Sequence, residues 1–387
     1  MSARYTSRQM IERLIGFDTT SRLSNLELIG WVRDYLAGHG VESRLVFDAT
    51  GTKANLFATL GPPERPGIVL SGHTDVVPVD GQDWHTEPFR AVERDGRLYG
   101  RGTCDMKSYL GVALALVPEF LARGLGTPIH LALSYDEEVG CIGVRRLIAD
   151  LAERGVRPVC CIVGEPTEMR VVVGHKGKLS MRCHVRGHEC HSALAHLGVN
   201  AIEAAAEAIA FLNRLARRQR DEGPHDRLFE PPYTTIQTGL IRGGTALNIV
   251  AGECSFDFEL RHLPGVDPRA LLAELVDHCD QVLAPPMRAV APDAGFRFEE
   301  LTAFPGLDLP EDAEVAQLAK ALSGANATGK VAFGTEAGLF QQAGVPTVVC
   351  GPGSIEQAHK PDEFIALEQI ALCEGFMRRL MDRVCVD

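Results

Sequence analysis

Apolar strand-like runs alternate with helical periodicity over the first 175 residues, and this alternation most narrows the folds open to the chain. Helical spacing of apolar residues covers about 4–16, 25–38, 108–123 and 143–154, and short apolar runs lie at about 55–60, 68–71, 129–134 and 159–163. Strands joined through helices pair in parallel, because each crossover returns the chain to the same end of the sheet. The sequence therefore predicts an α/β fold with a mostly parallel sheet and helices on both faces.

The middle of the chain follows a different pattern. Polar and apolar residues alternate at about 179–185, 234–241 and 254–260, and two helical stretches lie among them at about 200–217 and 268–282. Such alternation is typical of a sheet with one solvated face. After residue 304 the helix and strand pattern of the first part returns. We therefore expect one α/β domain, residues 1–178 and 304–387, interrupted by a smaller α+β domain of residues 179–303.

The charge balance argues against several classes of protein. The chain has 51 Asp and Glu against 39 Lys and Arg, a formal net charge of −12, which disfavours nucleic acid and anionic membranes as partners. No apolar run approaches the roughly 20 residues that span a bilayer, and the polar start lacks the apolar core of a signal peptide. The 11 cysteines, at irregular spacings, are then expected to be reduced thiols in a cytoplasmic protein.

Titratable side chains follow one of the predicted strands. The run 68–71 leads into His73 and Asp75 in the motif GHTDVVP. Open parallel sheets bind ligands beyond the carboxyl ends of their strands, which is where this pair is expected. A histidine there can bind a metal while the neighbouring aspartate fixes its tautomer. A plain hydrogen bond between the two side chains in a turn would explain the same pair.

Three further acidic segments occupy comparable positions. Asp105 lies in the glycine-rich segment GRGTCDMKS, Glu137 and Glu138 lie in the strand-ending motif SYDEEVG, and Glu165 lies in VGEPT. The glycine-rich segment is not expected to bind a dinucleotide, because Asp105 replaces the third glycine of that fingerprint. Any one of these segments can be a solvated acidic turn. Together they deliver carboxylates to one sheet edge, which favours a site for divalent cations.

A second histidine is needed if two metal ions share this site. His359, which follows the apolar run 345–350 in the motif AHKPDE, is the natural candidate. One histidine and one terminal carboxylate for each ion, with Asp105 as a bridge, form a two-metal hydrolase centre. One glutamate of the Glu137-Glu138 pair is then left to face the substrate as a general base, because adjacent side chains diverge.

Cysteine and histidine also crowd residues 183–191, as Cys183, His184, His188, Cys190 and His191. A structural zinc site requires two ligand pairs at characteristic spacings, and this segment does not supply them. We therefore do not expect a structural zinc ion there.

The motifs GHTDVVP, YGRGTCDMKS, SYDEEVG, VGEPT and AHKPDE, spread over nearly the whole chain, resemble those of the co-catalytic zinc deacylases and aminopeptidase-like exopeptidases. That family includes acetylornithine deacetylase, succinyl-diaminopimelate desuccinylase, aminoacylase and glutamate carboxypeptidase. Within it, GTCDMKS and the late stretch from FGTEAG to HKPDEF are most similar to acetylornithine deacetylase. The resemblance implies a dizinc hydrolase of linear amides.

The resemblance also implies roles for the residues of these motifs. His73 and Glu165 would bind one zinc ion, Glu138 and His359 the other, and Asp105 would bridge the two. Co²⁺ or Mn²⁺ would suit the same ligands. The peptide bond after the bridging aspartate, Asp105-Met106, would be cis.

The catalytic residues implied are Asp75, Glu137 and His191. Asp75 would support His73, and Glu137 would take a proton from the water that attacks the acyl carbonyl. His191, in GHECHSALAH, would reach into the active site of a partner chain to polarise that carbonyl. A structural histidine is the ordinary alternative for His191. The inserted domain would be a lid and a dimerisation domain, so the resemblance implies a cytoplasmic homodimer.

Residues for the substrate are implied less directly. Asn248 in GGTALNIV and Arg261 in FELRHLPG match positions that hold the α-carboxylate in relatives, and a guanidinium suits a carboxylate. We hypothesise that Glu336 in GTEAG, or a neighbour, meets the δ-ammonium of ornithine. The expected reaction is hydrolysis of Nα-acetyl-L-ornithine to acetate and ornithine, in arginine biosynthesis. The alternatives are another N-acyl amino acid deacylase, a desuccinylase or a carboxypeptidase of the family, and, from a different class, a non-catalytic metal-binding or ligand-binding relative.

Overall fold

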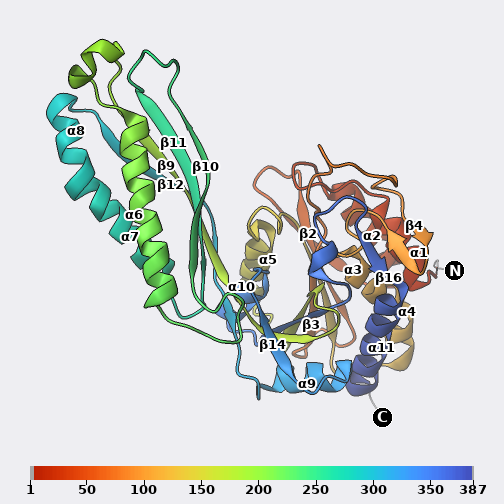
Figure 1. Cartoon of the computed structure of the whole chain (residues 1–387). Coiled ribbons are helices and arrows are strands. Elements are labelled where there is room, and N and C mark those ends of the chain that lie inside the picture. Colours follow the sequence, from red (N-terminus) through yellow and green to blue (C-terminus); the bar gives the residue numbers. More distant parts are fainter. Residues whose placement is uncertain (1–3, 386–387) are drawn as a thin grey trace. The chain divides into compact units, whose positions relative to one another are not determined.

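The computed structural model describes residues 4–385 and divides into two compact units (Figure 1). Unit 1 comprises residues 1–174, 307–330 and 335–387, and unit 2 comprises residues 175–306 and 331–334. Each unit has its own hydrophobic core. Among the described residues, no helix is long and apolar enough to cross a membrane.

A large sheet forms the centre of unit 1 and runs in the order β1-β2-β6-β3-β7-β15-β8-β13, with β14 paired to β8. Its strands are β1 Ser43–Phe47, β2 Ala54–Leu60, β3 Ile68–His73, β6 Ile129–Ser134, β7 Cys160–Pro166, β8 Val171–His175, β13 Leu307–Asp308, β14 Thr328–Val331 and β15 Thr347–Gly351. The central neighbours β6, β3, β7 and β15 pair in parallel, whereas β1-β2, β2-β6 and β15-β8 are antiparallel. The four parallel strands are almost wholly buried, as expected for strands covered on both faces.

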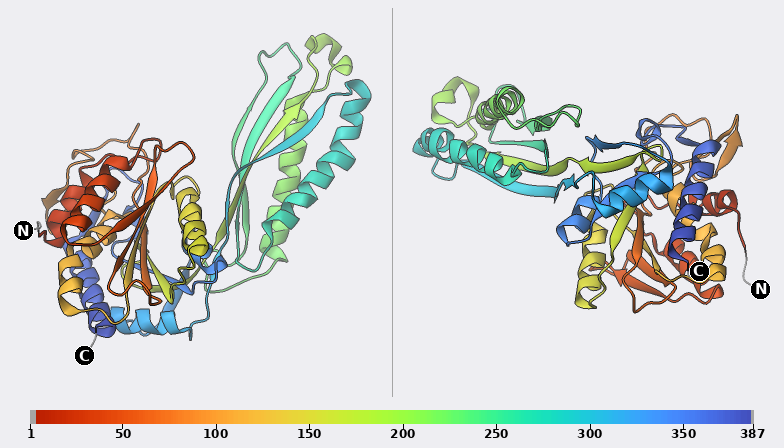
Figure 2. Two further views of the ribbon diagram at one scale, coloured as in Figure 1. Left: turned by 180° about the vertical axis from the view of Figure 1, so that it is seen from behind. Right: turned by 90° about the horizontal axis from the view of Figure 1, so that it is seen from below.

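Helices cover both faces of this sheet, with α5 on one side of the strands and α1, α2, α3 and α11 on the other (Figures 1 and 2). The helices of unit 1 are α1 Ser7–Ile15, α2 Leu26–Gly38, α3 Lys107–Ala115, α4 Val117–Arg123, α5 Ile142–Glu153, α9 Glu314–Ser323, α10 Ala337–Gln342 and α11 Leu367–Val384. Local sequence fixes some of their ends: Thr6 and Gln9 form a capping box at the start of α1. The predicted α/β fold class with a parallel sheet and covering helices is confirmed.

Unit 2 is built on an antiparallel sheet in the order β10-β11-β9-β12. Its strands are β9 Gly177–Arg186, β10 Thr235–Gly243, β11 Glu253–His262 and β12 Gly295–Phe304, and its helices are α6 Ala201–Asp221, α7 Pro268–His278 and α8 Ala284–Val290. Burial alternates residue by residue along β11 and, apart from the buried Ser180, along β9, so one face is buried in the core and the other is more exposed. Asn200 caps α6, and Asp267 with Pro268 begins α7.

Some elements differ from the sequence prediction. The helix expected over 108–123 is two helices, α3 and α4, with Pro118 in the first turn of the second. The helix expected over 268–282 ends at His278, passes through a π-helical turn at Cys279–Leu283 and continues as α8. Shorter elements had no expected counterpart: β1, β8, α10, and the small sheet of β4 Val92–Arg94, β5 Arg97–Tyr99 and β16 Phe364–Ala366. Such short pieces carry too few residues for a periodic signal.

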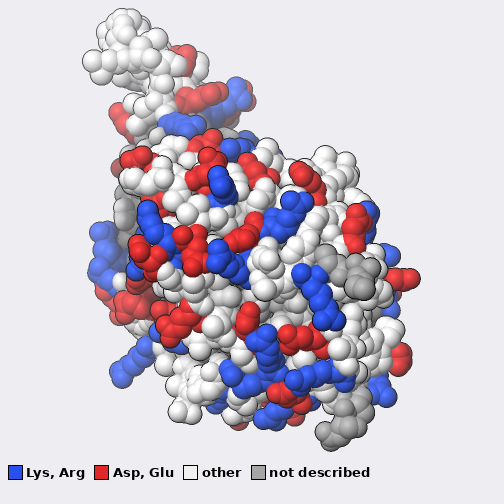
Figure 3. Space-filling model, turned by 90° about the vertical axis from the view of Figure 1, so that its right-hand side faces the viewer, with Lys and Arg blue, Asp and Glu red and all other residues white. Residues whose placement is uncertain are grey.

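Charged side chains of both signs intermingle on the face shown in Figure 3, without a continuous basic surface. Ion pairs in unit 1 include those of Arg123 with Asp382 and of Arg378 with Glu119.

Candidate active site

Four parallel strands bring most of the predicted site residues of unit 1 to one edge of the large sheet. His73 ends β3, Glu137 and Glu138 follow the end of β6, and Glu165 lies near the end of β7. The chain after β15 leads to His359. Because β6, β3, β7 and β15 are neighbours and run in the same direction, their carboxyl ends meet at this edge.

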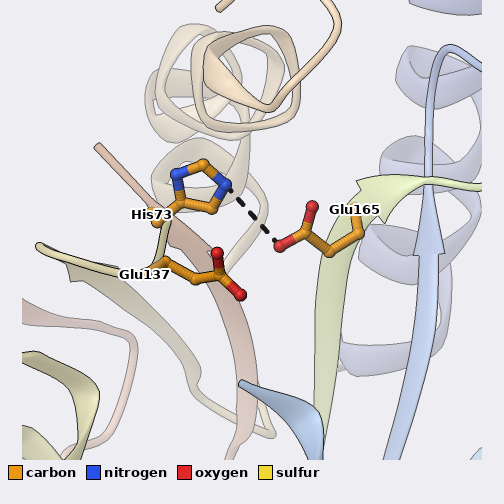
Figure 4. A group of neighbouring side chains, drawn as sticks. All are labelled: His73, Glu137 and Glu165. Atoms are coloured by element: carbon orange, nitrogen blue, oxygen red, sulfur yellow. Dashed lines mark ion pairs between the residues drawn. The ribbon is translucent and has the colours of Figure 1, made fainter. Parts of the chain in front are cut away.

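His73 lies at the centre of the cluster, with only 1% of its side chain exposed. Its Nε2 is 3.0 Å from Oδ1 of Asp105 and 3.6 Å from Oε1 of Glu165. Figure 4 shows three side chains that converge: His73 from β3, Glu137 from the loop that follows β6, and Glu165 from β7. The structure therefore brings Asp105 and Glu165 to the same nitrogen of His73.

His359 approaches Asp105 from the other side. Its Nε2 is 3.2 Å from Oδ2 of Asp105 and 3.1 Å from Oε2 of Glu138. The histidine has a positive φ of 63° and is half exposed, whereas Asp105 and Glu138 are almost fully buried. Asp105 thus lies between the two histidines, with one oxygen toward each, and the peptide bond that follows it, Asp105-Met106, is cis.

The donor set of this cluster fits divalent cations. Ligand atoms of His73, Asp105 and Glu138 lie within 4.8 Å of one another, and so do those of His73, Glu137 and Glu165. Oε1 of Glu165 is buried and has no hydrogen-bond partner among the described residues, which leaves it open to a ligand. Imidazole with carboxylate is a usual set for borderline and hard divalent ions. Within the described residues, these two groups supply ligand atoms for divalent cations, and His359 adds an imidazole 3.2 Å from Oδ2 of Asp105.

The pKa values of these groups show how strongly the charges are crowded without a cation. Burial raises the pKa of Glu137 to about 8, and the carboxylates of Glu138 and Asp105 act in the same direction. Burial and Asp105 also raise the pKa of Glu165 well above its usual range. Burial alone would lower the pKa of His73, but Glu165 and Asp105 outweigh it and raise that pKa. Bound cations would remove the mutual repulsion of the carboxylates.

Asp75 contacts the site differently from the expectation. Nδ1 of His73 is 2.9 Å from the backbone carbonyl oxygen of Asp75 and 3.6 Å from its carboxylate. The carboxylate instead accepts hydrogen bonds from the backbone N–H groups of Glu137 and Glu138 and from the hydroxyl of Ser21. The side chain of Asp75 therefore mainly fixes the turn that carries the two glutamates, while its backbone orients His73.

Glu336 is buried between two strands of the large sheet. It has no exposed surface, and its two carboxylate oxygens accept hydrogen bonds from the hydroxyls of Ser71 in β3 and Ser134 in β6. No surface of Glu336 is open to a ligand in this structure, because the residue is buried and both oxygens accept hydrogen bonds inside the sheet. The sequence could not show this, since both partners lie far away along the chain. The hypothesis that Glu336 or a neighbour meets the ammonium of ornithine stays a prediction.

The other predicted residues, His191, Asn248 and Arg261, belong to unit 2. His191 is exposed, and its Nδ1 accepts a hydrogen bond from the backbone of Ala193. Asn248 is exposed. Its backbone carbonyl oxygen accepts a hydrogen bond from the backbone N–H of Ser192, so Asn248 lies beside the segment that contains His191. Arg261 donates to Glu259 within β11. The Cys183 to His191 stretch forms no group of three metal ligands within the described residues.

Sequence reasoning missed several residues that hold this site together. Lys53 pairs with Asp136 and also donates to the backbone carbonyl of Ser21, which ties the loop after β6 to the rest of unit 1. Cys141 is buried, with its sulfur 3.3 Å from Oε1 of Glu137. These contacts join residues distant in the sequence or lack a motif, so no local pattern marks them.

The sequence matches the peptidase family M20/M25/M40 over residues 69–383. The chain belongs to this family. A curated relative named acetylornithine deacetylase, from Myxococcus xanthus, is 36% identical, with 98% of this chain and 97% of that protein covered. The family resemblance drawn from the motifs is confirmed, and with it a metal-dependent hydrolase of amide or peptide bonds.

Solved structures of the family share the fold. A metallo-carboxypeptidase from Sulfolobus solfataricus matches with a TM-score of 0.77 at 17% identity, covering 97% of this chain and 98% of that one. A dinuclear metal-binding peptidase from Bacillus subtilis matches with a TM-score of 0.63 at 16% identity, covering 98% of each chain. At these identities the likeness speaks for the fold alone.

Proposed function

We propose that this chain is a two-metal amidohydrolase that converts Nα-acetyl-L-ornithine to acetate and L-ornithine, a step of arginine biosynthesis. The hydrolytic part of the proposal rests on the position of Asp105: one of its carboxylate oxygens faces His73 and the other faces His359. The name of the Myxococcus xanthus relative supports the acetylornithine part. The dinuclear site described for the Bacillus subtilis neighbour supports two ions. Zn²⁺ is the proposed metal, with Co²⁺ or Mn²⁺ as substitutes, and we place the enzyme in the cytoplasm.

In this proposal His73 and Glu165 would hold one ion, Glu138 and His359 would hold the other, and Asp105 would contribute to both. When bound, the ions polarise the acyl carbonyl and acidify the attacking water. Glu137, beside Glu138 and Glu165, accepts the proton of that water on a carboxylate oxygen and then returns it to the nitrogen of the departing amine. Once the second proton of the water has also moved to the amine nitrogen, water and amide have become acetate and a protonated amine. Asp75 holds the turn of Glu137 in place.

The roles of unit 2 are also proposals. We assign residues 179–303 to a lid and dimerisation domain, with Asn248 and Arg261 as ligands of the substrate carboxylate and His191 as a donor to the acyl oxygen. Strand β10 lies at the edge of its sheet and carries the exposed apolar side chains of Leu240 and Ile241. An open apolar edge of this kind suits a second copy of the chain.

A substrate panel tests the reaction. Wild-type enzyme loaded with Zn²⁺ is assayed against Nα-acetylornithine, N-acetylnorvaline, N-succinyl-diaminopimelate and a dipeptide. We expect the highest kcat/KM for Nα-acetylornithine. Equal values for Nα-acetylornithine and N-acetylnorvaline would contradict recognition of the δ-ammonium, and preference for the succinyl substrate or the dipeptide would identify another member of the family. Failure to hydrolyse any of them would favour a non-catalytic relative.

Complementation between variants tests the partner role of His191. Glu137→Gln and His191→Ala are each expected to be nearly inactive. If His191 acts on the site of the second chain, mixing the two variants creates one intact site in each mixed dimer, and about a quarter of wild-type activity returns. No recovery in a sample shown to contain mixed dimers would contradict this role.

A further inference from the structure

Arg101 and Glu363 form a buried ion pair next to the metal-ligand cluster. Nη1 of Arg101 is 2.7 Å from Oε2 of Glu363, and both side chains are only 1% exposed. Neither residue is assigned a role in the hydrolytic reaction proposed above. Burying two charges is costly, and it is repaid only where the pair makes further hydrogen bonds. The partners of each group therefore indicate what the pair does.

The carboxylate of Glu363 binds the loop that ends in Asp105. It accepts hydrogen bonds from the backbone N–H groups of Gly102, at 3.1 Å, of Cys104, at 2.8 Å, and of Asp105 itself, at 3.0 Å. Three N–H groups converge on one carboxylate only if the loop folds around it, and Gly102 has a positive φ of 85° that suits glycine. The backbone of Asp105 is thus fixed by Glu363.

Arg101 extends the same network toward His359. Its Nη2 donates to Oε1 of Gln82, and Nε2 of Gln82 donates to the backbone carbonyl oxygen of His359 at 2.8 Å. The guanidinium also lies over the ring of Trp84, 5.1 Å from its centroid. A planar group with several donors can hold an acid, an amide and a ring at once, which a lysine cannot.

We propose that Glu363 and Arg101 are positioning residues that set the distance between Asp105 and His359 and thereby the affinity of the centre for its metals. The inference rests on the proposed two-metal site. Glu363 fixes the bridging aspartate from its backbone, and Arg101 couples that loop through Gln82 to the loop of His359. Removal of such outer partners weakens metal binding by about tenfold to a hundredfold.

A purely structural pair would behave differently. It would stabilise unit 1, and its loss would lower thermal stability while the folded protein bound Zn²⁺ as before. The measurement must therefore follow metal affinity on folded protein and stability separately.

The experiment compares wild type with Glu363→Gln, Arg101→Lys and Gln82→Leu. Apo protein is titrated with Zn²⁺ in the presence of a competing chelator, and bound metal is counted per chain. Asp257→Asn in unit 2 is the matched control, because it removes one carboxylate from a hydrogen-bonded arginine pair, Arg182–Asp257, and Asp257 is remote in sequence from every proposed metal ligand. Circular dichroism and the thermal midpoint of each apo protein report folding.

We expect a wild-type stoichiometry of two Zn²⁺ and an affinity lowered by about tenfold to a hundredfold in Glu363→Gln and by less in Arg101→Lys and Gln82→Leu, with Asp257→Asn unchanged. Wild-type affinity in folded Glu363→Gln would overturn the inference. If Glu363→Gln does not fold, the half-buried Gln82→Leu decides: an unchanged affinity there would overturn the coupling to His359. Wild type that binds no Zn²⁺ would instead overturn the proposed function itself.

Discussion

The predicted site residues of the two units lie in contrasting surroundings. In unit 1, His73, Asp105 and Glu165 are almost fully buried and contact one another. In unit 2, His191 and Asn248 are exposed, and within that unit they contact mainly their own segment of backbone. The first group is held by a sheet edge and by outer partners such as Asp75 and Glu363.

This contrast matches the two kinds of role proposed for these residues. A metal centre needs ligands fixed before the ion arrives, and the buried network of unit 1 supplies that order. A side chain that only approaches the substrate can remain exposed until the site is complete. Changes at the proposed metal ligands of unit 1 are therefore expected to alter metal binding, stability and rate together, whereas changes at the exposed residues of unit 2 are expected to alter the rate alone.

The largest effect is expected at Glu137. Replacement by Gln keeps the shape of the side chain but removes the proton acceptor, so kcat falls by about 10²- to 10⁴-fold. The two Zn²⁺ ions remain bound, because Glu137 is not a proposed ligand. Steady-state kinetics and metal analysis check both statements, and Glu153→Gln on the exposed face of α5 is the control. Normal kcat in Glu137→Gln would exclude it as the base.

Removal of metal is expected to destabilise unit 1 and spare unit 2. The crowded carboxylates of Asp105, Glu138 and Glu165 repel one another without a cation, and a ligand at 1,000 times its Kd stabilises a fold by about 4 kcal/mol. Hydrogen exchange with and without a chelator should show lost protection at β3 and β7 and no change at α6. Equal losses of hydrogen-exchange protection in both units would contradict a metal effect that is confined to unit 1.

A smaller effect on the rate is expected at His191. Replacement by Ala removes a donor to the developing oxyanion, and such donors contribute about 10²- to 10³-fold to kcat. Because His191 is exposed, the thermal midpoint should stay within about 1 °C of wild type, as surface changes rarely matter for stability. A loss of stability equal to that of a buried variant would show that His191 is structural.

The smallest effect is expected from acidification, which should lower the stability of both units to a similar extent. Burial lowers the pKa of His130 in unit 1 and of His175 in unit 2 to about 4. Each folded-state pKa lies below the unfolded value near 6.5, so the stabilisation is complete above pH 6.5 and is lost as the pH falls toward 4. Between pH 6.5 and 5 the free energy of unfolding should fall by about 1.5 kcal/mol for each histidine.

Urea unfolding of wild type, His130→Gln and His175→Gln at both pH values checks this. Each variant should lose less stability than wild type on acidification, and His39→Gln serves as a histidine control. A variant that loses as much as wild type would show that its histidine already titrates in the folded protein.

The sequence predicted much of the candidate site because the fold repeats one local rule. Each strand that ends in a polar motif delivers it to the same edge, so the strand endings at His73, Glu138 and Glu165 and the loop motif of Asp105 were sufficient to expect a cluster. Their roles as metal ligands stay predictions. The burial of Glu336 was not predicted, because the direction of its side chain depends on Ser71 and Ser134, which no motif connects to it.

The amino-acid sequence alone determined the family, the α/β fold class and the set of titratable residues, since periodicity and motifs are properties of short segments. Tertiary structure alone decided the outer partners: the carboxylate of Asp75 beneath the Glu137 turn, the burial of Glu336, and Glu363 bound to the backbone of Asp105. These contacts join segments more than 60, 200 and 250 residues apart. Only the pairing of the strands brings such segments within hydrogen-bond distance, because no local interaction encodes a contact over that separation.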